Sequence, residues 1–333
     1  MDLRLGLYRS ADEHRLDAAA TTQLERSAGL GDAPLGLARR VALGLAVGAA
    51  ALIGLGLVFW VAAHWDTLGR MGRFALLQGT LLVMAAGAGL RPAARIPLSL
   101  LVLLATGALL AYFGQTYQTG ADAWQLFALW AALMLPLALG LRSDVLWAPW
   151  ALVAMTAVAL WVQTHTGHSW RAEPHDLPAH AAGWALALGV VALLSPPLQA
   201  RTGAGVWALR TALTLAVVMV SASALGGLFQ ARVAGHYALG LLVLGALAAV
   251  LAIGPARWFD IFGLSAAALG LNTLLFAGLA RALFDSGGGS SDPLGRFLLL
   301  GLVAAGLLAA TVSIILRLQR AHDARHGKTG EPA

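Results

Sequence analysis

The chain alternates between long apolar segments and short polar connections. A membrane-spanning helix needs about 20 apolar residues, with a range of about 17–25. Ten segments have this character, and they cover residues 41–63, 74–90, 96–114, 124–141, 145–163, 180–195, 206–229, 236–254, 259–283 and 295–317. The pattern therefore predicts an all-α, polytopic transmembrane helix bundle of about ten membrane-spanning helices. The second and sixth segments are the shortest, so the alternatives of eight or nine crossings stay open.

Residues 1–40 are mostly polar and precede the first apolar segment. Ser10 and Glu13 fit the S-x-x-E capping box, and an apolar stripe follows it, which predicts one short amphipathic helix. The stripe consists of Leu16, Ala20 and Leu24. Three parts result: the polar segment, a bundle over 41–317, and a tail over 318–333 that we expect to be disordered. Because the polar segment precedes residues 41–63, we interpret these residues as an uncleaved membrane helix rather than as a signal peptide.

Composition agrees with a membrane protein. Hydrophobic residues make up 59% of the 333 residues and charged residues only 11%, whereas soluble proteins carry about 25% charged residues. The net charge of +6 does not point to nucleic acid, because the arginines stand singly at the ends of apolar segments. The partner that this composition predicts is the lipid bilayer. The absence of cysteine excludes disulfides and thiol chemistry.

The basic residues predict an orientation, because Lys and Arg concentrate in cytoplasmic loops. With the N-terminus inside, the outer side holds Arg70, Arg73, Arg171, Arg232, Arg281 and Arg296, and the other 16 of the 22 basic residues lie inside. We therefore expect a multi-pass protein of a bacterial inner membrane, with both the N-terminus and the C-terminus in the cytoplasm.

A polar set gathers at the predicted outer ends of the first four spanning segments. It consists of His64, Asp66, Gln115, Tyr117, Gln118, Asp122 and Trp124. Asp122 stands where it can cap the fourth helix. Polar backbone and side chains near membrane depth are tolerated where they line a cavity or are buried in protein. We interpret the set as ligand-binding residues of an outward-facing pocket, with a purely structural turn as the alternative.

Other polar residues have weaker signals. The loop over 164–180 holds His165, His168, Glu173, His175, Asp176 and His180, but their spacing matches no metal motif, so we predict no metal and no cofactor. Arg210 and Asp260 both lie just inside the inner ends of their predicted helices and can pair, and the alternative is that Arg210 extends to the membrane interface. Asn272 lies mid-span, where polar side chains usually bond helices together. Gly44 and Gly48 form a GxxxG motif for close helix packing.

Two stretches carry a resemblance to a known family. The run GLGLVFWVAAHWD at 54–66 and the run GQTYQTGADAWQLF at 114–127 resemble sequences in the bacterial membrane family called domain of unknown function 2157. The polar helix before the first span also fits that family. The resemblance implies a polytopic inner-membrane protein without an established activity. That family often has Asn where this chain has His64, so no role is carried over to this position.

Three functions compete. The first is a membrane protein that binds or transports a small polar solute or lipid head group. The second is a scaffold or assembly factor, and the third is an enzyme on a lipid-linked substrate, with Asp66 or Asp122 as base or metal ligand. No P-loop, HExxH or GxSxG motif occurs. No apolar segment contains glutamate, which disfavours proton-coupled transport. We favour the first function, and the sequence favours a non-enzyme over an enzyme without deciding between them.

Overall fold

The computed structural model describes residues 3–28, 37–64, 69–117, 120–167, 172–230, 233, 235–285 and 293–327, and within these ranges it is helical without any strand. Two helices precede the bundle, α1 (Leu3–Glu13) and α2 (Ala18–Ser27). The long helices are α3 (Leu37–Ala63), α4 (Arg70–Leu90), α5 (Arg95–Tyr117), α6 (Ala123–Leu141), α7 (Asp144–Thr166), α8 (Leu177–Leu194), α10 (Val206–Leu228), α11 (Gly235–Ile253), α12 (Ile261–Asp285) and α13 (Pro293–Gly327). Short helices connect them: η1 (Pro92–Ala94), η2 (Pro174–Asp176), α9 (Pro196–Thr202) and η3 (Ala256–Trp258).

Each predicted apolar segment corresponds to one long helix, which confirms the all-α polytopic fold. Nine helices of the described chain are long and apolar enough to cross a membrane. The tenth is α3, a helix of 27 residues whose described apolar part is Val41–Gly56. The sixth segment is longer than expected, because η2 leads directly into α8 and the two together cover 21 residues.

Both polar ends of the chain differ from the prediction. The N-terminal segment contains two helices, and Ser10 lies inside α1 rather than at a helix start. The cap belongs instead to Asp17, whose carboxylate accepts the Ala20 N–H at 2.7 Å. At the other end α13 continues to Gly327, so the part of the tail expected to be disordered is helical as far as the structure describes it.

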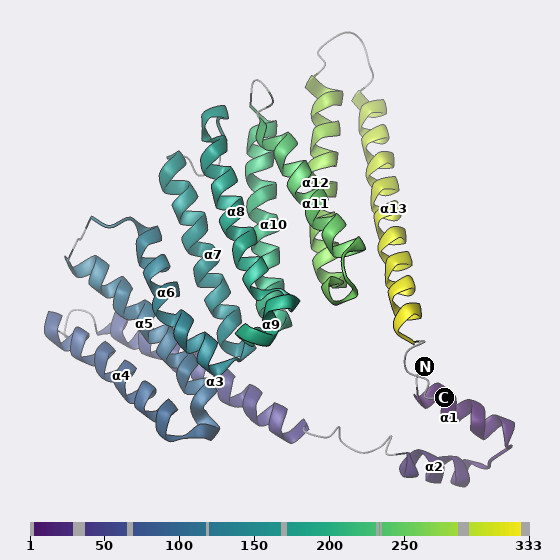
Figure 1. The fold of residues 1–333 in the computed structure, drawn as a ribbon, viewed down its shortest axis with the longest axis horizontal. Helices are drawn as coiled ribbons and strands as arrows, with labels where there is room; N and C mark the ends of the chain where they lie inside the picture. Colours follow the sequence, from purple (N-terminus) through teal and green to yellow (C-terminus); the bar gives the residue numbers. More distant parts are fainter. Residues whose placement is uncertain are drawn as a thin grey trace.

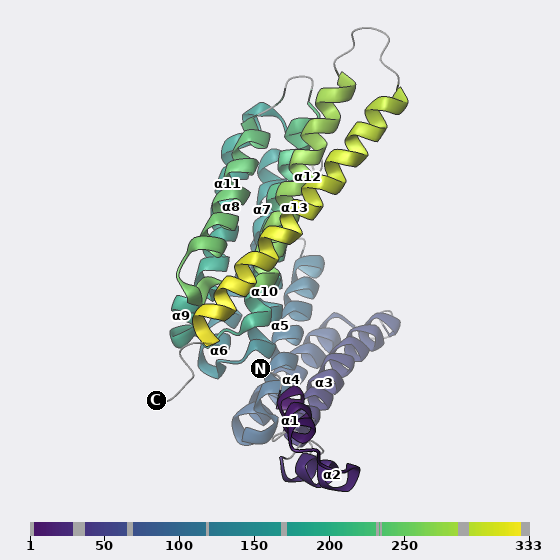
Figure 2. The same ribbon diagram turned by 90° about the vertical axis from the view of Figure 1, so that its right-hand side faces the viewer.

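Two helices organise the packing. Helix α10 packs against α7, α8, α11 and α12, and α5 packs against α3, α4, α6 and α7. Figure 1 shows α7, α8, α10, α12 and α13 running nearly side by side, whereas α3, α4 and α5 cross them at a steep angle. Figure 2 shows α13 along α12 at one edge. The helices α1 and α2 lie apart from the bundle (Figure 1).

Close helix packing uses other glycines than the predicted GxxxG motif. A Cβ added at Gly44 or Gly48 would meet nothing within 4 Å in the described structure. A Cβ at Gly107 would instead lie 2.4 Å from the Trp130 ring, and one at Gly240 would lie 2.6 Å from the Ala224 side chain. Glycines therefore allow close contact between α5 and α6 and between α10 and α11.

One carboxylate links the first half of the bundle to the second. Asp144, in the first turn of α7, accepts the backbone N–H groups of Gly205 at 3.0 Å, Trp207 at 2.8 Å and Ala208 at 3.0 Å. These N–H groups are at the N-terminus of α10, where no intrahelical partner exists. Beside it, the buried Trp147 indole N–H donates to the Thr202 carbonyl at 3.0 Å. We call this end of the bundle, which holds α9, the α9 end. It is the end that the arginines predict to be inside.

Replacement of Asp144 by alanine should destabilise the bundle, because three backbone donors, two of them half-buried, lose their acceptor. We expect Asp144→Ala to lower the free energy of unfolding in detergent by about 2 kcal/mol. Asp122→Ala is the matched control, since Asp122 stands at the N-cap of α6 without a side-chain capping bond. Equal losses in the two variants would contradict this role of Asp144.

Candidate functional site

The described members of the predicted ligand-binding set lie at the end of the bundle opposite α9. Gln115 and Tyr117 are on the last turn of α5, and Asp122 and Trp124 begin α6. His64 directly follows α3. Asp66 and Gln118 lie outside the described residues. Asp122 occupies the predicted cap position, but its carboxylate is exposed and makes no capping bond.

Tyr117 and His64 have aromatic neighbours of their own. The Tyr117 ring is 4.8 Å from that of Phe113 and 5.8 Å from that of Phe74, which is on α4. The His64 ring stacks on Trp60 at a centroid distance of 4.6 Å, with Nδ1 3.0 Å from the Trp60 carbonyl oxygen. Tyr117 therefore belongs to the contact between α4 and α5, and His64 to the end of α3.

Trp124 is the member whose hydrogen bonding is incomplete. Its Nε1 atom is buried and has no hydrogen-bond partner among the described residues. Its ring lies 6.4 Å from that of His165, at the end of α7. Four other indole groups, all inside the bundle, donate to the chain itself at 2.8–3.0 Å, namely those of Trp130, Trp147, Trp150 and Trp184. Trp124 thus offers a donor for which the described residues supply no acceptor.

The polar residues of the histidine-rich loop over 164–180 lie at two separate places in the structure. His165 lies against Trp124, whereas Asp176 and His180 meet His236 of α11. His180 Nδ1 is 3.1 Å from the Asp176 carbonyl oxygen and 3.3 Å from His236 Nε2. A carbonyl only accepts, so an imidazole N–H of this pair donates to the Asp176 carbonyl oxygen, and the two rings face one another through the contact of His180 Nδ1 with His236 Nε2.

The Nδ1 atom of His236 is buried and has no partner in the described structure. Sequence reasoning missed this residue, since a lone histidine at a helix start gives no signal for a partner 56 positions away. No group of three or more metal-ligating side chains occurs within the ranges that the structure describes. His168 lies outside those ranges.

Two predicted contacts inside the bundle are confirmed. Arg210 pairs with Asp260 through hydrogen bonds of 2.7 and 3.3 Å, which join α10 to the start of α12. Asn272 donates to Thr311 at 3.1 Å and accepts from it at 3.2 Å, which joins α12 to α13. These residues hold helices together and are engaged within the protein.

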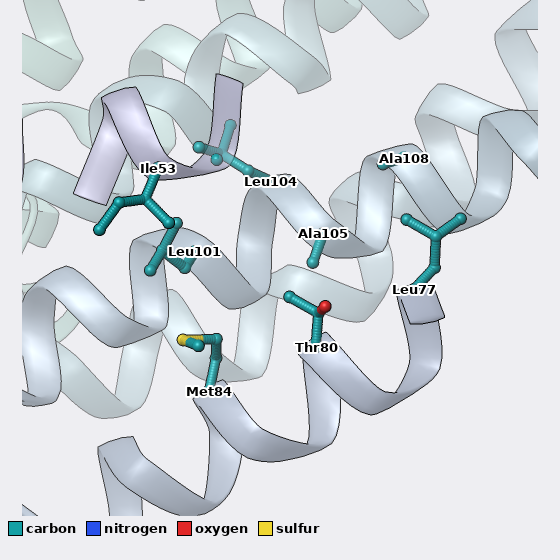
Figure 3. A pocket seen from close by; sticks show the side chains of 9 residues that line it. Ile53, Leu77, Thr80, Met84, Leu101, Leu104, Ala105 and Ala108 are labelled. Atoms are coloured by element: carbon teal, nitrogen blue, oxygen red, sulfur yellow. The ribbon is translucent and has the colours of Figure 1, made fainter. Parts of the chain in front are cut away.

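Three cavities lie away from the predicted ligand-binding set. Figure 3 shows the cavity between α3, α4 and α5, whose volume is about 30 Å³ and whose only polar lining residue is Thr80. This is room for about one water molecule and not for a ligand. A cavity of about 360 Å³ between α4, α5 and α6 contains Arg95 and the buried Ser99, whose Oγ has no partner in the described structure. Another of about 360 Å³ lies at the α9 end, between α8, α9, α10, α11 and η3.

These observations define a polytopic α-helical membrane protein. The described chain has many long apolar helices, they expose apolar side chains at the outer surface, and their polar side chains form hydrogen bonds within the bundle. Residues 9–147 match a family model described as "Predicted membrane protein (DUF2157)". This match confirms the family resemblance over the first part of the chain, including both stretches that carried it. No curated protein and no solved structure matches the chain.

The Arg210–Asp260 pair can be tested by a double-mutant cycle. Each single variant, Arg210→Met or Asp260→Asn, should lower the free energy of unfolding by about 3 kcal/mol, because it leaves the other charge half-buried without its partner. The double variant should recover part of this loss. Chemical denaturation in detergent measures all three. Strictly additive losses would mean that the two side chains do not stabilise one another.

Proposed function

We propose that this chain is a membrane protein that binds a small polar solute or lipid head group around Trp124, at the end of the bundle opposite α9. The single observation that supports this proposal most is the buried Trp124 Nε1–H, which has no acceptor among the described residues. Leaving a buried donor unsatisfied costs about 1–3 kcal/mol. A ligand oxygen that accepts this hydrogen bond would remove that cost.

The neighbouring polar groups suit such a ligand. Asp122 is exposed and uncommitted to helix capping, and Gln115 is exposed one connection away on α5. An amide both donates and accepts, and a carboxylate accepts from hydroxyl or ammonium groups. Together with the indole donor they favour a ligand with mixed hydrogen-bonding groups, as polyols and lipid head groups have.

The arrangement of the carboxylates argues against an enzyme. Three carboxylates of the bundle are engaged by the protein: Asp144 caps α10, Asp260 pairs with Arg210, and Asp176 accepts the Glu173 N–H at 3.1 Å. Asp122 alone, without a paired base or a metal-ligand partner in the described site, is a weak catalytic group. Binding is therefore the function that the geometry supports best.

Variants of the Trp124 site test the proposal. In detergent, sn-glycerol 3-phosphate, phosphoethanolamine and glycerol serve as soluble probes, and thermal unfolding measures their binding. At least one probe should raise the melting temperature of the unmodified chain. Trp124→Phe and the double variant Gln115→Ala/Asp122→Asn should weaken its binding by about tenfold. Trp207→Phe, an exposed tryptophan at the α9 end, is the control. If no probe binds, or if Trp124→Phe binds as well as the control, the proposal fails.

We also propose that both termini lie in the cytoplasm of a bacterial cell, as the arginine distribution favours. Because the chain has no cysteine, single cysteines report orientation without background. Thr164→Cys, exposed at the end of α7, should react with a membrane-impermeant maleimide in intact cells. Thr22→Cys, exposed on α2, should react only after permeabilisation. The reverse pattern would invert the topology.

A further inference from the structure

The cavity at the α9 end has the size and shape of a ligand site. Its volume of about 360 Å³ falls in the range of roughly 300–1,000 Å³ for small-molecule pockets. Most of its wall is aliphatic and comes from helices far apart in the sequence, including Leu188, Val191, Leu209, Leu213, Leu247 and Leu251. Such a wall fits a hydrocarbon chain.

One end of this cavity is polar, and its uncommitted groups are donors. Ser195 and Gln199 already donate to backbone carbonyls of their own connection, Ala192 and Leu194. Trp258 has a buried Nε1 without a partner, and Arg257 is exposed without a carboxylate partner in the described structure. Arginine and the indole N–H donate and never accept. The polar end therefore calls for an acceptor that carries negative charge.

Asp260 lines the same cavity, and its charge does not oppose an anion. The Arg210 guanidinium holds both of its carboxylate oxygens, at 2.7 and 3.3 Å. Asp260 also accepts the Gly263 N–H at 3.0 Å. With Asp260 neutralised by Arg210, Arg257 leaves the cavity with a net positive charge.

The α13 extension closes one side of this region. His322 stacks on Phe259, a lining residue, with ring centroids 4.6 Å apart and an angle of 18° between the planes. On another side, Val206 and Val250 are 50% and 43% exposed, so apolar lining residues reach the outer surface of the bundle. In a membrane protein that surface faces lipid, which gives an acyl chain a way in.

We propose that the α9-end cavity binds an anionic membrane lipid, with one acyl chain along the aliphatic wall and the phosphate at Arg257 and Trp258. Basic pockets between spanning helices bind anionic head groups in this way, and an arginine forms strong charge-assisted hydrogen bonds to phosphate. This site is distinct from the Trp124 site, which lies at the other end of the bundle.

Lipid titrations of the full chain in nonionic detergent test this inference, with native mass spectrometry as the measurement. Phosphatidylglycerol should bind the unmodified chain, and phosphatidylcholine with the same acyl chains should bind at least tenfold more weakly. Arg257→Gln and Trp258→Phe should each weaken phosphatidylglycerol binding by about tenfold. Arg201→Gln is the matched control, because Arg201 is exposed on α9 and does not line the cavity.

Two further measurements separate the acyl chain from the phosphate. Ala192→Phe places a ring in the cavity without a change of charge and should also weaken phosphatidylglycerol binding. Inorganic phosphate at the same concentration should not compete with the lipid. Equal binding of the two lipids, equal losses in Arg257→Gln and Arg201→Gln, unchanged binding in Ala192→Phe, or displacement by phosphate would each overturn the inference. None of these outcomes depends on the Trp124 site.

Discussion

The Asp144 carboxylate is the interaction on which the arrangement of the bundle depends. In a bilayer the first N–H groups of a spanning helix find little water, so they need an acceptor from the protein. Asp144 accepts three of them at the start of α10, and α10 is the helix against which α7, α8, α11 and α12 all pack. The position of α10 against α7 therefore fixes where the second half of the bundle lies.

This requirement also shapes the α9 end as a whole. The connection from α8 to α10 cannot be a simple turn, because it must bring the α10 N-terminus to Asp144 while Trp147 holds the Thr202 carbonyl. Helix α9 takes up the intervening residues and runs across the lower ends of the long helices rather than along them (Figure 1). The space left between α9, the long helices and η3 is the lipid-sized cavity. The cavity is thus a consequence of how the two halves are joined.

The helices were predictable from the sequence because hydropathy and length are local properties, and each of the ten segments became a helix. Arg210 and Asp260 were also predictable, since two opposite charges at the same depth have few other partners. Asp144 and His236 were not, because their partners lie 61–64 and 56 positions away and depend on which helices become neighbours. The prediction of close packing at Gly44 and Gly48 was wrong for the same reason. Two small residues at this spacing permit another helix to approach, but they do not determine whether a helix packs against them.

The indole groups give a physical basis for expecting ligands at both ends. Inside the bundle the tryptophan donors are matched to carbonyl or hydroxyl acceptors, so the fold is able to satisfy them. Trp124 and Trp258 break this rule in the described structure, and each stands where a long helix meets a connection, which is where a spanning helix is expected to reach the membrane boundary. Lipid head groups and polar solutes lie at this depth and carry acceptor oxygens. A buried donor in the bundle centre would cost stability, whereas one at the boundary is placed where the surroundings supply an acceptor.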